Sequence, residues 1–303
     1  MGYIILDLEF NNMQNITKYY PHIYEKNRYL RTLEVQNEII QIGAVKLDDN
    51  MKQIDSYKVY TKSCAFPVLN PIITNITGIT HKDLRNAISL KDGLIGLKKF
   101  VGTDNIVCSW ATDDIAEIVI NAKYQGYDDV FWIEKYLDLQ NYCTKLLSYK
   151  KPIGLKVALA ELKIEVDQSK LHDALNDSIY TAEVLRKVYE KEKIEKAIVD
   201  DVYALPTLKI KDLRKHDPSI IDMEFKCKNC NTDLTVVEPL ALLVNKFISL
   251  GKCETCDGKY LQEVYLRKNI AGKIMYSDEI TTLDNFEYFN YSYKFKSSRK
   301  NKN

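Results

Sequence analysis

The sequence opens with a short apolar segment that runs into acidic residues, Tyr3-Ile4-Ile5-Leu6-Asp7-Leu8-Glu9-Phe10 (YIILDLEF). Its apolar first half is rich in isoleucine and predicts a buried strand. Asp7 and Glu9 are two residues apart at the end of this strand, so their side chains share one face of a sheet. Two carboxylates on one face repel each other unless a cation lies between them. The pair therefore indicates a metal site or, alternatively, a solvated strand end.

The rest of the N-terminal two-thirds alternates strand-like and helix-like segments. This alternation predicts an α/β sheet domain. Between the first two strands, Met13–Asn37 is polar and aromatic without a clear period, and we interpret it as an inserted loop or lid. Strands are expected at 38–47, 53–61, 106–110 and 128–132, and helices at 90–101, 113–125, 138–147, 155–162 and 174–198.

The chain is long enough for two domains, since its 303 residues compare with about 150 per domain. Around Leu205–Pro218 the pattern breaks at two prolines and a charged stretch. Beyond it come closely spaced cysteines and short β-like runs. We therefore expect a domain at 1–202, a linker at 203–221, and a small β-rich domain with a basic and aromatic tail at 222–303.

Composition excludes several classes of protein. With 46% apolar and 28% charged residues the chain has ordinary globular composition, and its net charge of +1 rules out a uniformly basic nucleic-acid coat. No apolar run reaches the roughly 18 residues of a membrane-spanning helix, and the N-terminus lacks the features of a signal peptide. We expect a cytoplasmic protein with no membrane partner.

Two further segments place acidic residues at expected helix starts. Asp114, with its neighbour Asp113, follows the strand at 106–110. His172 precedes Asp177 by five residues at the start of the helix expected from residue 174. Each has a plainer explanation, because acidic residues favour helix N-termini and Asp173 is a good N-cap residue.

Taken together, these segments resemble the DEDDh 3′–5′ exonucleases, also called the DnaQ-like or RNase T-like exonucleases. The resemblance covers residues 1–190 in the family's order and spacing, and within the family it is closest to the KapD-type bacterial proteins. The segments that carry it are ILDLEF (Ile5–Phe10), EIIQIGAVKLD (Glu38–Asp48), ITGITHKDL (Ile76–Leu84), SWATDDIAEI (Ser109–Ile118) and HDALNDSIYTAEVL (His172–Leu185).

The resemblance implies an RNase H-like mixed sheet flanked by helices, and a set of catalytic residues. Asp7, Glu9, Asp114 and Asp177 correspond to the family's four metal-binding acids, and His172 to its general base. Two Mg²⁺ or Mn²⁺ ions suit this site, because hard cations prefer carboxylate oxygens and two such ions can catalyse phosphodiester hydrolysis.

The expected reaction is removal of nucleoside 5′-monophosphates from single-stranded 3′ ends, with RNA slightly favoured over DNA. A wall for the terminal bases, or else ordinary core packing, is expected from Leu8, Phe10, Ile76 and Ile79. Two rival functions stay open: a DNA proofreading or repair subunit that docks a polymerase, and a non-catalytic nucleic-acid-binding scaffold.

The second domain carries two Cys-x₂-Cys pairs, Cys227–Cys230 and Cys253–Cys256, with 22 residues between them. This spacing predicts one structural zinc ion bound by four thiolates in a zinc ribbon. Gly258 is expected to supply the positive φ that such turns use. The other three cysteines, Cys64, Cys108 and Cys143, do not belong to this set.

Charge separates the two parts of the chain. Residues 1–202 contain 26 basic and 29 acidic residues, whereas residues 203–303 contain 17 and 13. The end of the chain, from Tyr293, adds Lys294, Lys296, Arg299, Lys300 and Lys302 among aromatic residues. Such a segment suits single-stranded nucleic acid, with a solvated extension as the alternative. The ribbon itself is expected to bind nucleic acid or a protein partner.

Overall fold

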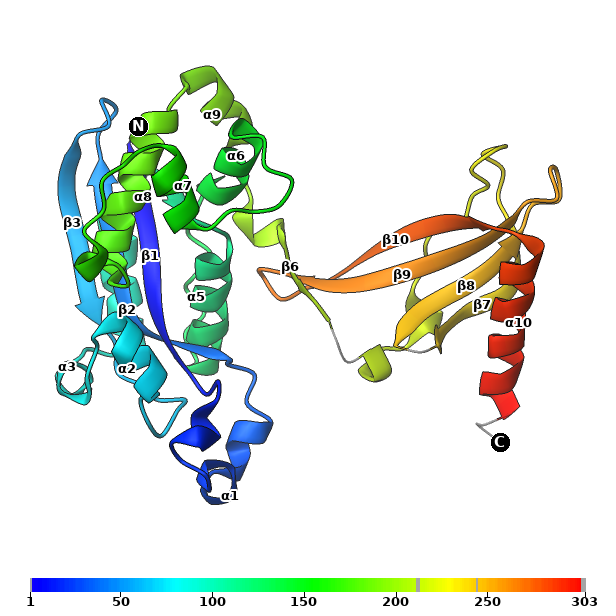
Figure 1. Cartoon of the computed structure of the whole chain (residues 1–303), viewed down its shortest axis with the longest axis horizontal. Helices are drawn as coiled ribbons and strands as arrows, with labels where there is room; N and C mark the ends of the chain where they lie inside the picture. The colour runs from blue at the N-terminus through cyan, green and yellow to red at the C-terminus, as the bar shows by residue number, and fades with distance from the viewer. Residues whose placement is uncertain (1, 211–212, 244, 301–303) are drawn as a thin grey trace. The chain divides into compact units, whose positions relative to one another are not determined.

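The computed structural model describes residues 2–210, 213–243 and 245–300. The chain forms two compact units, Met1–Leu205 and Pro206–Asn303 (Figure 1). No helix among the described residues is both long and apolar enough to cross a bilayer. Each unit is described by itself below.

The first unit is built on a mixed five-stranded sheet, in the order β3-β2-β1-β4-β5. The central strand β1 is antiparallel to β2 and parallel to β4. This arrangement, flanked by helices, confirms the predicted RNase H-like α/β fold. The strands are β1 (Tyr3–Asn12), β2 (Asn37–Leu47), β3 (Gln53–Tyr60), β4 (Ile106–Ser109) and β5 (Lys135–Asp138).

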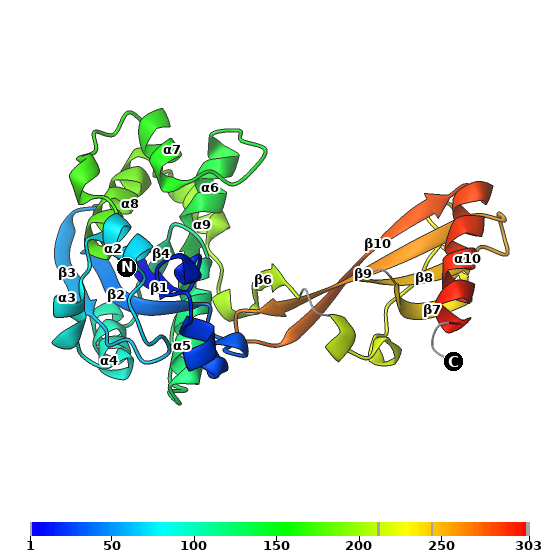
Figure 2. The ribbon, with the colours of Figure 1, turned by 60° about the horizontal axis from the view of Figure 1, so that its bottom comes forward.

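Helices cover both faces of this sheet (Figure 2). One face packs against α6, α7 and α8 through a core that includes Ile5, Leu137, Leu159 and Leu185. On the other face, α4 approaches Ile42 through Gly93. The helices are α2 (Pro71–Thr77), α3 (His81–Arg85), α4 (Leu90–Val101), α5 (Asp113–Tyr124), α6 (Leu139–Leu146), α7 (Leu155–Glu161), α8 (Ala174–Val188) and α9 (Lys191–Ala197).

Two sequence-based predictions in this unit are wrong. Residues 128–132 are not a strand; the fifth strand is β5, which pairs with β4. The hydroxyl of Tyr203 donates to the carbonyl of Val130 and accepts from the N–H of Ile133, so these two backbone groups bond a side chain rather than a neighbouring strand. The expected helix 174–198 is broken, because Tyr189 and Glu190 adopt extended backbone between α8 and α9.

The insertion at 13–37 is a folded lobe rather than an irregular loop. It contains η1 (Ile16–Lys18), α1 (Ile23–Lys26) and η2 (Arg28–Arg31), and Asn37 already belongs to β2. Buried Ile16, Ile23 and Val35 anchor it. Its base is held by Asn70, whose side-chain amide donates to the carbonyls of Asn12 at 3.0 Å and Gln14 at 2.9 Å.

The second unit is an antiparallel sheet covered by one helix. Its strands follow the order β10-β9-β8-β7, and β6 pairs with β9. The segment expected as a linker, 203–221, thus contributes β6 to this sheet. The elements are β6 (Pro206–Lys209), β7 (Thr235–Leu243), β8 (Lys246–Lys252), β9 (Lys259–Asn269), β10 (Ile274–Leu283) and α10 (Asn285–Lys300).

The aromatic tail forms the helix α10 rather than a solvated extension, at least up to residue 300. Phe295, which is 1% exposed, anchors this helix against Leu250 and Leu261 of the sheet. Of the basic residues expected there, Lys302 lies outside the described residues, as do the side chains of Arg299 and Lys300.

One glycine permits a close approach between a helix and the sheet in the first unit. A Cβ atom on Gly43 of β2 would lie 2.2 Å from the carbonyl carbon of Ala174 and from the nitrogen of Leu175. Backbone atoms cannot move aside as a flexible side chain can. The first turn of α8 therefore rests directly on β2 because residue 43 has no side chain.

We predict that Gly43→Ala lowers the free energy of unfolding by at least the ~1–3 kcal/mol typical of overpacking. Urea unfolding measures this. Gly154→Ala is the control, because nothing lies within 4 Å of its added Cβ and its φ is −74°; it should cost less than about 1 kcal/mol. Equal stabilities for the two variants would contradict the close approach.

Candidate active site

Three of the predicted acids converge on one point of the first unit. Asp7 and Glu9 lie on β1, and Asp177 lies in the first turn of α8. Each offers a carboxylate oxygen that lies within 4.8 Å of the other two. The approach of α8 to β2 at Gly43, which pairs with Asp7 across the sheet, brings the third acid to the first two.

The fourth predicted acid, Asp114, lies in the first turn of α5 and is 9% exposed. It is not a member of the 4.8 Å group. Its charge nevertheless reaches Asp7: burial, followed by the charges of Asp114, Glu9 and Asp177, raises the pKa of Asp7 well above its usual value. Asp113, the neighbour that the motif does not select, is exposed.

The electrostatics of the cluster favour a bound cation. Burial, then the nearby charge of Asp177, raises the pKa of Glu9 to about 8. Burial also raises the pKa of Asp177. Within the described part of the chain, the Oδ1 atom of Asp177 is buried and has no hydrogen-bond partner. Carboxylate oxygens that are short of partners and repel one another are a donor set that fits a hard divalent cation.

His172 lies beside this cluster. Its backbone adopts a φ of 64°, and its N–H donates to Oδ2 of Asp177 at 3.1 Å. The side chain itself is exposed. The loop is therefore tied to Asp177 through its main chain, which leaves the imidazole at the surface next to the acids.

A hydrogen-bond network fixes the start of α8. Asp173 is the N-cap residue and accepts from the N–H of Asn176 at 3.2 Å. Lys58 of β3 donates to Oδ2 of Asp173 at 2.5 Å, and the side-chain amide of Gln41 donates to the same atom at 3.1 Å. The Oε1 atom of Gln41 in turn accepts from the N–H of Ala174 at 2.7 Å.

This network contains two residues that the sequence did not single out as functional. Gln41 is fully buried, and a signal existed, because it is a lone amide inside the apolar run Ile39–Val45. Lys58 gave no signal, since its contact depends on the pairing of β3 with β2. Although burial alone would raise the pKa of Asp173, the hydrogen bonds from Lys58 and its neighbours lower that pKa below its usual value.

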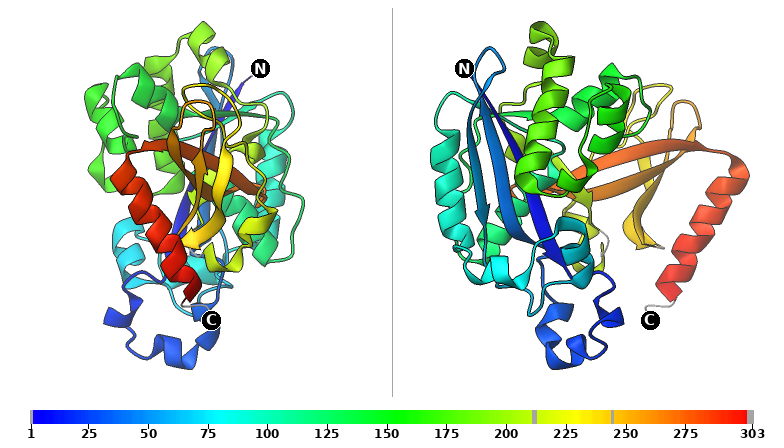
Figure 3. Two further views of the ribbon diagram at one scale, coloured as in Figure 1. Left: turned by 90° about the vertical axis from the view of Figure 1, so that its right-hand side faces the viewer. Right: turned by 60° about the vertical axis from the view of Figure 1, so that its left-hand side comes forward.

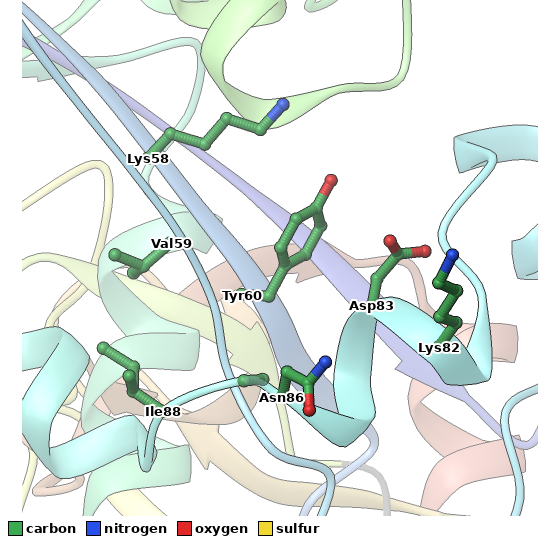
Figure 4. A pocket seen from close by; sticks show the side chains of 8 residues that line it. Lys58, Val59, Tyr60, Lys82, Asp83, Asn86 and Ile88 are labelled. Carbon is green, nitrogen blue, oxygen red and sulfur yellow. The ribbon is translucent and has the colours of Figure 1, made fainter.

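The sheet face that carries Asp7 and Glu9 extends across β2 to the edge strand β3. Gly43 pairs with Asp7 on one side and Lys58 on the other, and Gln41 likewise connects Glu9 with Tyr60. Paired residues share a face, so Lys58 and Tyr60 lie on the face of the acids. Beyond them is a hollow of ≈ 390 Å³ (Figure 4), which is lined by Lys58, Val59, Tyr60, Lys82, Asp83, Asn86, Ala87 and Ile88.

The four residues predicted to form an apolar wall for the terminal bases differ in their exposure. Leu8 is 4% exposed and alternates with Asp7 and Glu9 along β1, so it faces away from the acids. Ile79 is 3% exposed and packs against Ile40 and Leu84. Phe10 is half-buried, and Ile76 on α2 is 47% exposed. Only these last two present surface.

The second unit holds a separate sulfur cluster. The Sγ atoms of Cys227, Cys230, Cys253 and Cys256 all lie within 4.8 Å of one another. The side chain of Thr232 hydrogen-bonds Cys253 and lowers the pKa of that thiol to about 6. A compact set of four sulfur atoms, one of them readily ionised, fits a tetrahedral zinc ion.

The two Cys-x₂-Cys turns have the same backbone pattern. In each, the N–H of the first cysteine donates to the carbonyl five residues on, at 2.8 Å, and its carbonyl accepts from the N–H four residues on. In each, the residue after the second cysteine has a positive φ: 56° at Asn231 and 61° at Asp257. The expectation that Gly258 takes this conformation is wrong. Gly258 instead avoids the ring of Tyr260, which a Cβ would approach to 2.8 Å.

We predict that Gln41→Met lowers the free energy of unfolding by ~1–3 kcal/mol, because it leaves the N–H of Ala174 buried without its partner. Chemical denaturation measures this loss. Gln53→Met on the exposed part of β3 is the matched control and should change stability by less than about 0.5 kcal/mol. A Gln41 variant as stable as this control would show that the network does not hold α8.

Comparison with known proteins gives one family and several related structures. The profile of the exonuclease family RNase_T matches residues 4–185. A DNA polymerase III PolC-type protein of Clostridium perfringens is 28% identical over 183 residues, which is 60% of this chain and 12% of that protein. This chain therefore spans only about an eighth of the length of that relative.

The fold is shared with a solved nuclease domain. The nuclease domain of 3'hExo, a DEDDh family member solved with rAMP, superposes with a TM-score of 0.52 at 17% identity, over 66% of this chain and 96% of that domain. A full-length 3'-exonuclease gives a TM-score of 0.47 at 16% identity, over 60% of this chain and 79% of that one.

The family profile covers more than half of the chain, including β1, α5 and the first turn of α8. These are the elements that carry the four predicted acids. The chain thus belongs to the RNase T exonuclease family, the DEDDh or DnaQ-like 3′–5′ exonuclease enzymes.

Proposed function

We propose that the first unit removes nucleoside 5′-monophosphates one at a time from the 3′ end of single-stranded nucleic acid. One observation carries the proposal: half-buried carboxylates from β1 and α8 lie within 4.8 Å of one another, beside the exposed His172. A scaffold has no need of this arrangement, since mutual repulsion of closely spaced carboxylates destabilises the fold.

Family membership implies divalent metal ions at this site. We propose that Asp7, Glu9, Asp114 and Asp177 hold two Mg²⁺ or Mn²⁺ ions. When bound, such ions neutralise charge on the phosphate, lower the pKa of water and stabilise the leaving oxygen. The protein's own contribution is to fix the carboxylates on β1, α5 and α8, and the position of α8 against the sheet is set by Gly43 and Gln41.

His172 is the proposed general base. Its imidazole is exposed next to Asp177, where it can take a proton from water near the acids. An imidazole can accept and donate a proton near neutral pH, which suits this role. The hydrogen bond from its own main chain to Asp177 keeps the ring at the site.

The substrate is proposed to be single-stranded, with RNA slightly preferred to DNA. The related nuclease domain was solved with rAMP, a nucleoside monophosphate of the class expected as product. Phe10 and Ile76 are the apolar residues with surface to contact terminal bases. The similarity to a PolC-type polymerase supports proofreading of DNA as a second candidate function.

For the second unit we propose a structural zinc ribbon. Cys227, Cys230, Cys253 and Cys256 would fill all four positions of one Zn²⁺ and leave none for catalysis. The unit would add binding surface for nucleic acid or for a protein partner.

The central prediction concerns nucleotide release with Mn²⁺. Asp7→Ala or Asp177→Ala should abolish it, and His172→Ala should lower the rate by ~10²–10⁴ while the metal-induced rise in melting temperature persists. 5′-labelled single- and double-stranded RNA and DNA of one sequence serve as substrates. Ladders shortened from the 3′ end support the proposal, and their relative rates give the sugar preference. Full activity of Asp177→Ala would refute the assignment, and no ladder with any substrate would favour the scaffold.

For the ribbon, we predict one zinc ion per chain in the freshly purified protein. Cys253→Ser should lose it, and a chelator should expose the second unit to protease while the first unit resists, since structural zinc contributes directly to folding. Cys64→Ser, at an exposed cysteine outside the cluster, is the control and should keep the metal. Metal analysis that finds no zinc in the wild type would rule the ribbon out.

A further inference from the structure

The folded insertion, residues 13–36 (the inserted lobe), lies close to the acidic site. It begins four residues after Glu9 on β1, about 13 Å along an extended strand. Its base is bonded to Asn70, the N-cap residue of α2, and α2 carries the exposed Ile76. The lobe lies at the end of β1 next to α2 (Figures 1 and 3). A strand of nucleic acid that leaves the acids past α2 would meet it.

The lobe is positively charged within a negatively charged domain. It contains four basic residues, Lys18, Lys26, Arg28 and Arg31, against Glu25 and Glu34, although residues 1–202 have a net charge of −3. All four basic side chains are exposed, and within the described residues none of them forms an ion pair. These charges are thus available to a polyanion.

Tyrosine rings accompany these charges. Tyr19, Tyr20 and Tyr29 are 40%, 37% and 46% exposed, and the ammonium of Lys18 lies 5.8 Å from the ring centroid of Tyr19. A hollow of ≈ 290 Å³ opens between the lobe and the loop before α2. It is lined by Tyr19, Tyr20, Pro21, His22, Ile23, Lys26, Asn27, Pro67 and Val68.

The exposed tyrosines and basic residues of the lobe favour single-stranded nucleic acid over a duplex or a protein partner. Flat aromatic and prolyl walls suit stacking of an unpaired base, which every nucleotide offers, and the neighbouring lysines suit its phosphates. The bases of a duplex are stacked inside the helix and unavailable to tyrosines. Unpaired cations in an acidic domain favour a polyanion over a typical protein surface.

We propose that the inserted lobe binds nucleotides upstream of the 3′ end of a single strand, with one base in the hollow at Tyr19 and Tyr20 and Lys26 at the phosphates. The proposal rests on the proposed function of the acidic site and adds where the rest of the strand binds. It requires that affinity depend on strand length, because a strand too short to reach the lobe gains nothing from it.

Binding is tested first, without hydrolysis. In an Asp7→Ala background, fluorescence anisotropy measures Kd for 5′-fluorescein oligouridylate and oligothymidylate of about 16 nucleotides. Tyr20→Ala should raise Kd about 10-fold, and Lys26→Ala should reduce the slope of log Kd against log salt by about one. Tyr149→Ala, at another exposed tyrosine, is the control and should change neither.

A second experiment separates this role from catalysis. The same substitutions are made in the protein with Asp7 intact, and hydrolysis of a trinucleotide is compared with hydrolysis of the long strand. The kcat/KM for the trinucleotide should be unchanged by Tyr20→Ala, whereas KM for the long strand should rise about 10-fold. Unchanged Kd for both long strands would overturn the proposal and leave the lobe to a protein partner. An equal loss with the trinucleotide would also overturn it. Binding that depends on the lobe, in a wild type that hydrolyses nothing, would instead refute the proposed function alone.

Discussion

The mutual repulsion of closely spaced, half-buried carboxylates is the constraint on which the first unit depends. Asp7, Glu9 and Asp177 lie within 4.8 Å of one another, and the charge of Asp114 reaches them. Partial burial reduces the water that screens these charges, and the pKa of each of the three carboxyl groups is raised. An arrangement of this kind costs stability unless a cation occupies it. The rest of the fold supplies the stability that keeps the acids together.

That support comes from the meeting of α8 with the sheet. Gly43 lets the first turn of the helix rest on β2, and Gln41 hydrogen-bonds both Asp173 and the main chain of Ala174. The edge strand β3 adds Lys58, whose ammonium group donates to Asp173 at 2.5 Å. Asp7 and Glu9 on β1 and Asp177 on α8, far apart in sequence, are thus positioned by contacts of other residues. In the second unit, two turns with the same backbone hydrogen-bond pattern bring four sulfur atoms together.

Much of the fold and of the candidate site was predictable from local sequence patterns. The predictions that were wrong concern features that depend on pairing between distant segments. Local patterns suffice for apolar strands and for acids at helix starts, and the mixed α/β fold follows. The fifth strand was misplaced because 128–132 (DDVFW) and 135–138 (KYLD) are both short segments that mix charged and apolar residues, and pairing with β4 distinguishes them. The tether from Lys58 depends on strand register, which no local pattern encodes. The conformation expected of Gly258 belongs to Asp257, because the glycine is needed beside Tyr260.

We propose that the cluster of acids lowers the stability of the fold when no cation is bound and raises it when one is bound. The most direct measurement is the free energy of unfolding of the wild type and Asp177→Asn, each with a chelator and with excess Mn²⁺. With the chelator, the variant should be at least as stable as the wild type, because it removes one charge from the cluster. With Mn²⁺, the wild type should gain stability by mass action and overtake the variant. A variant that is less stable in the chelator, and gains as much from Mn²⁺ as the wild type, would contradict the account.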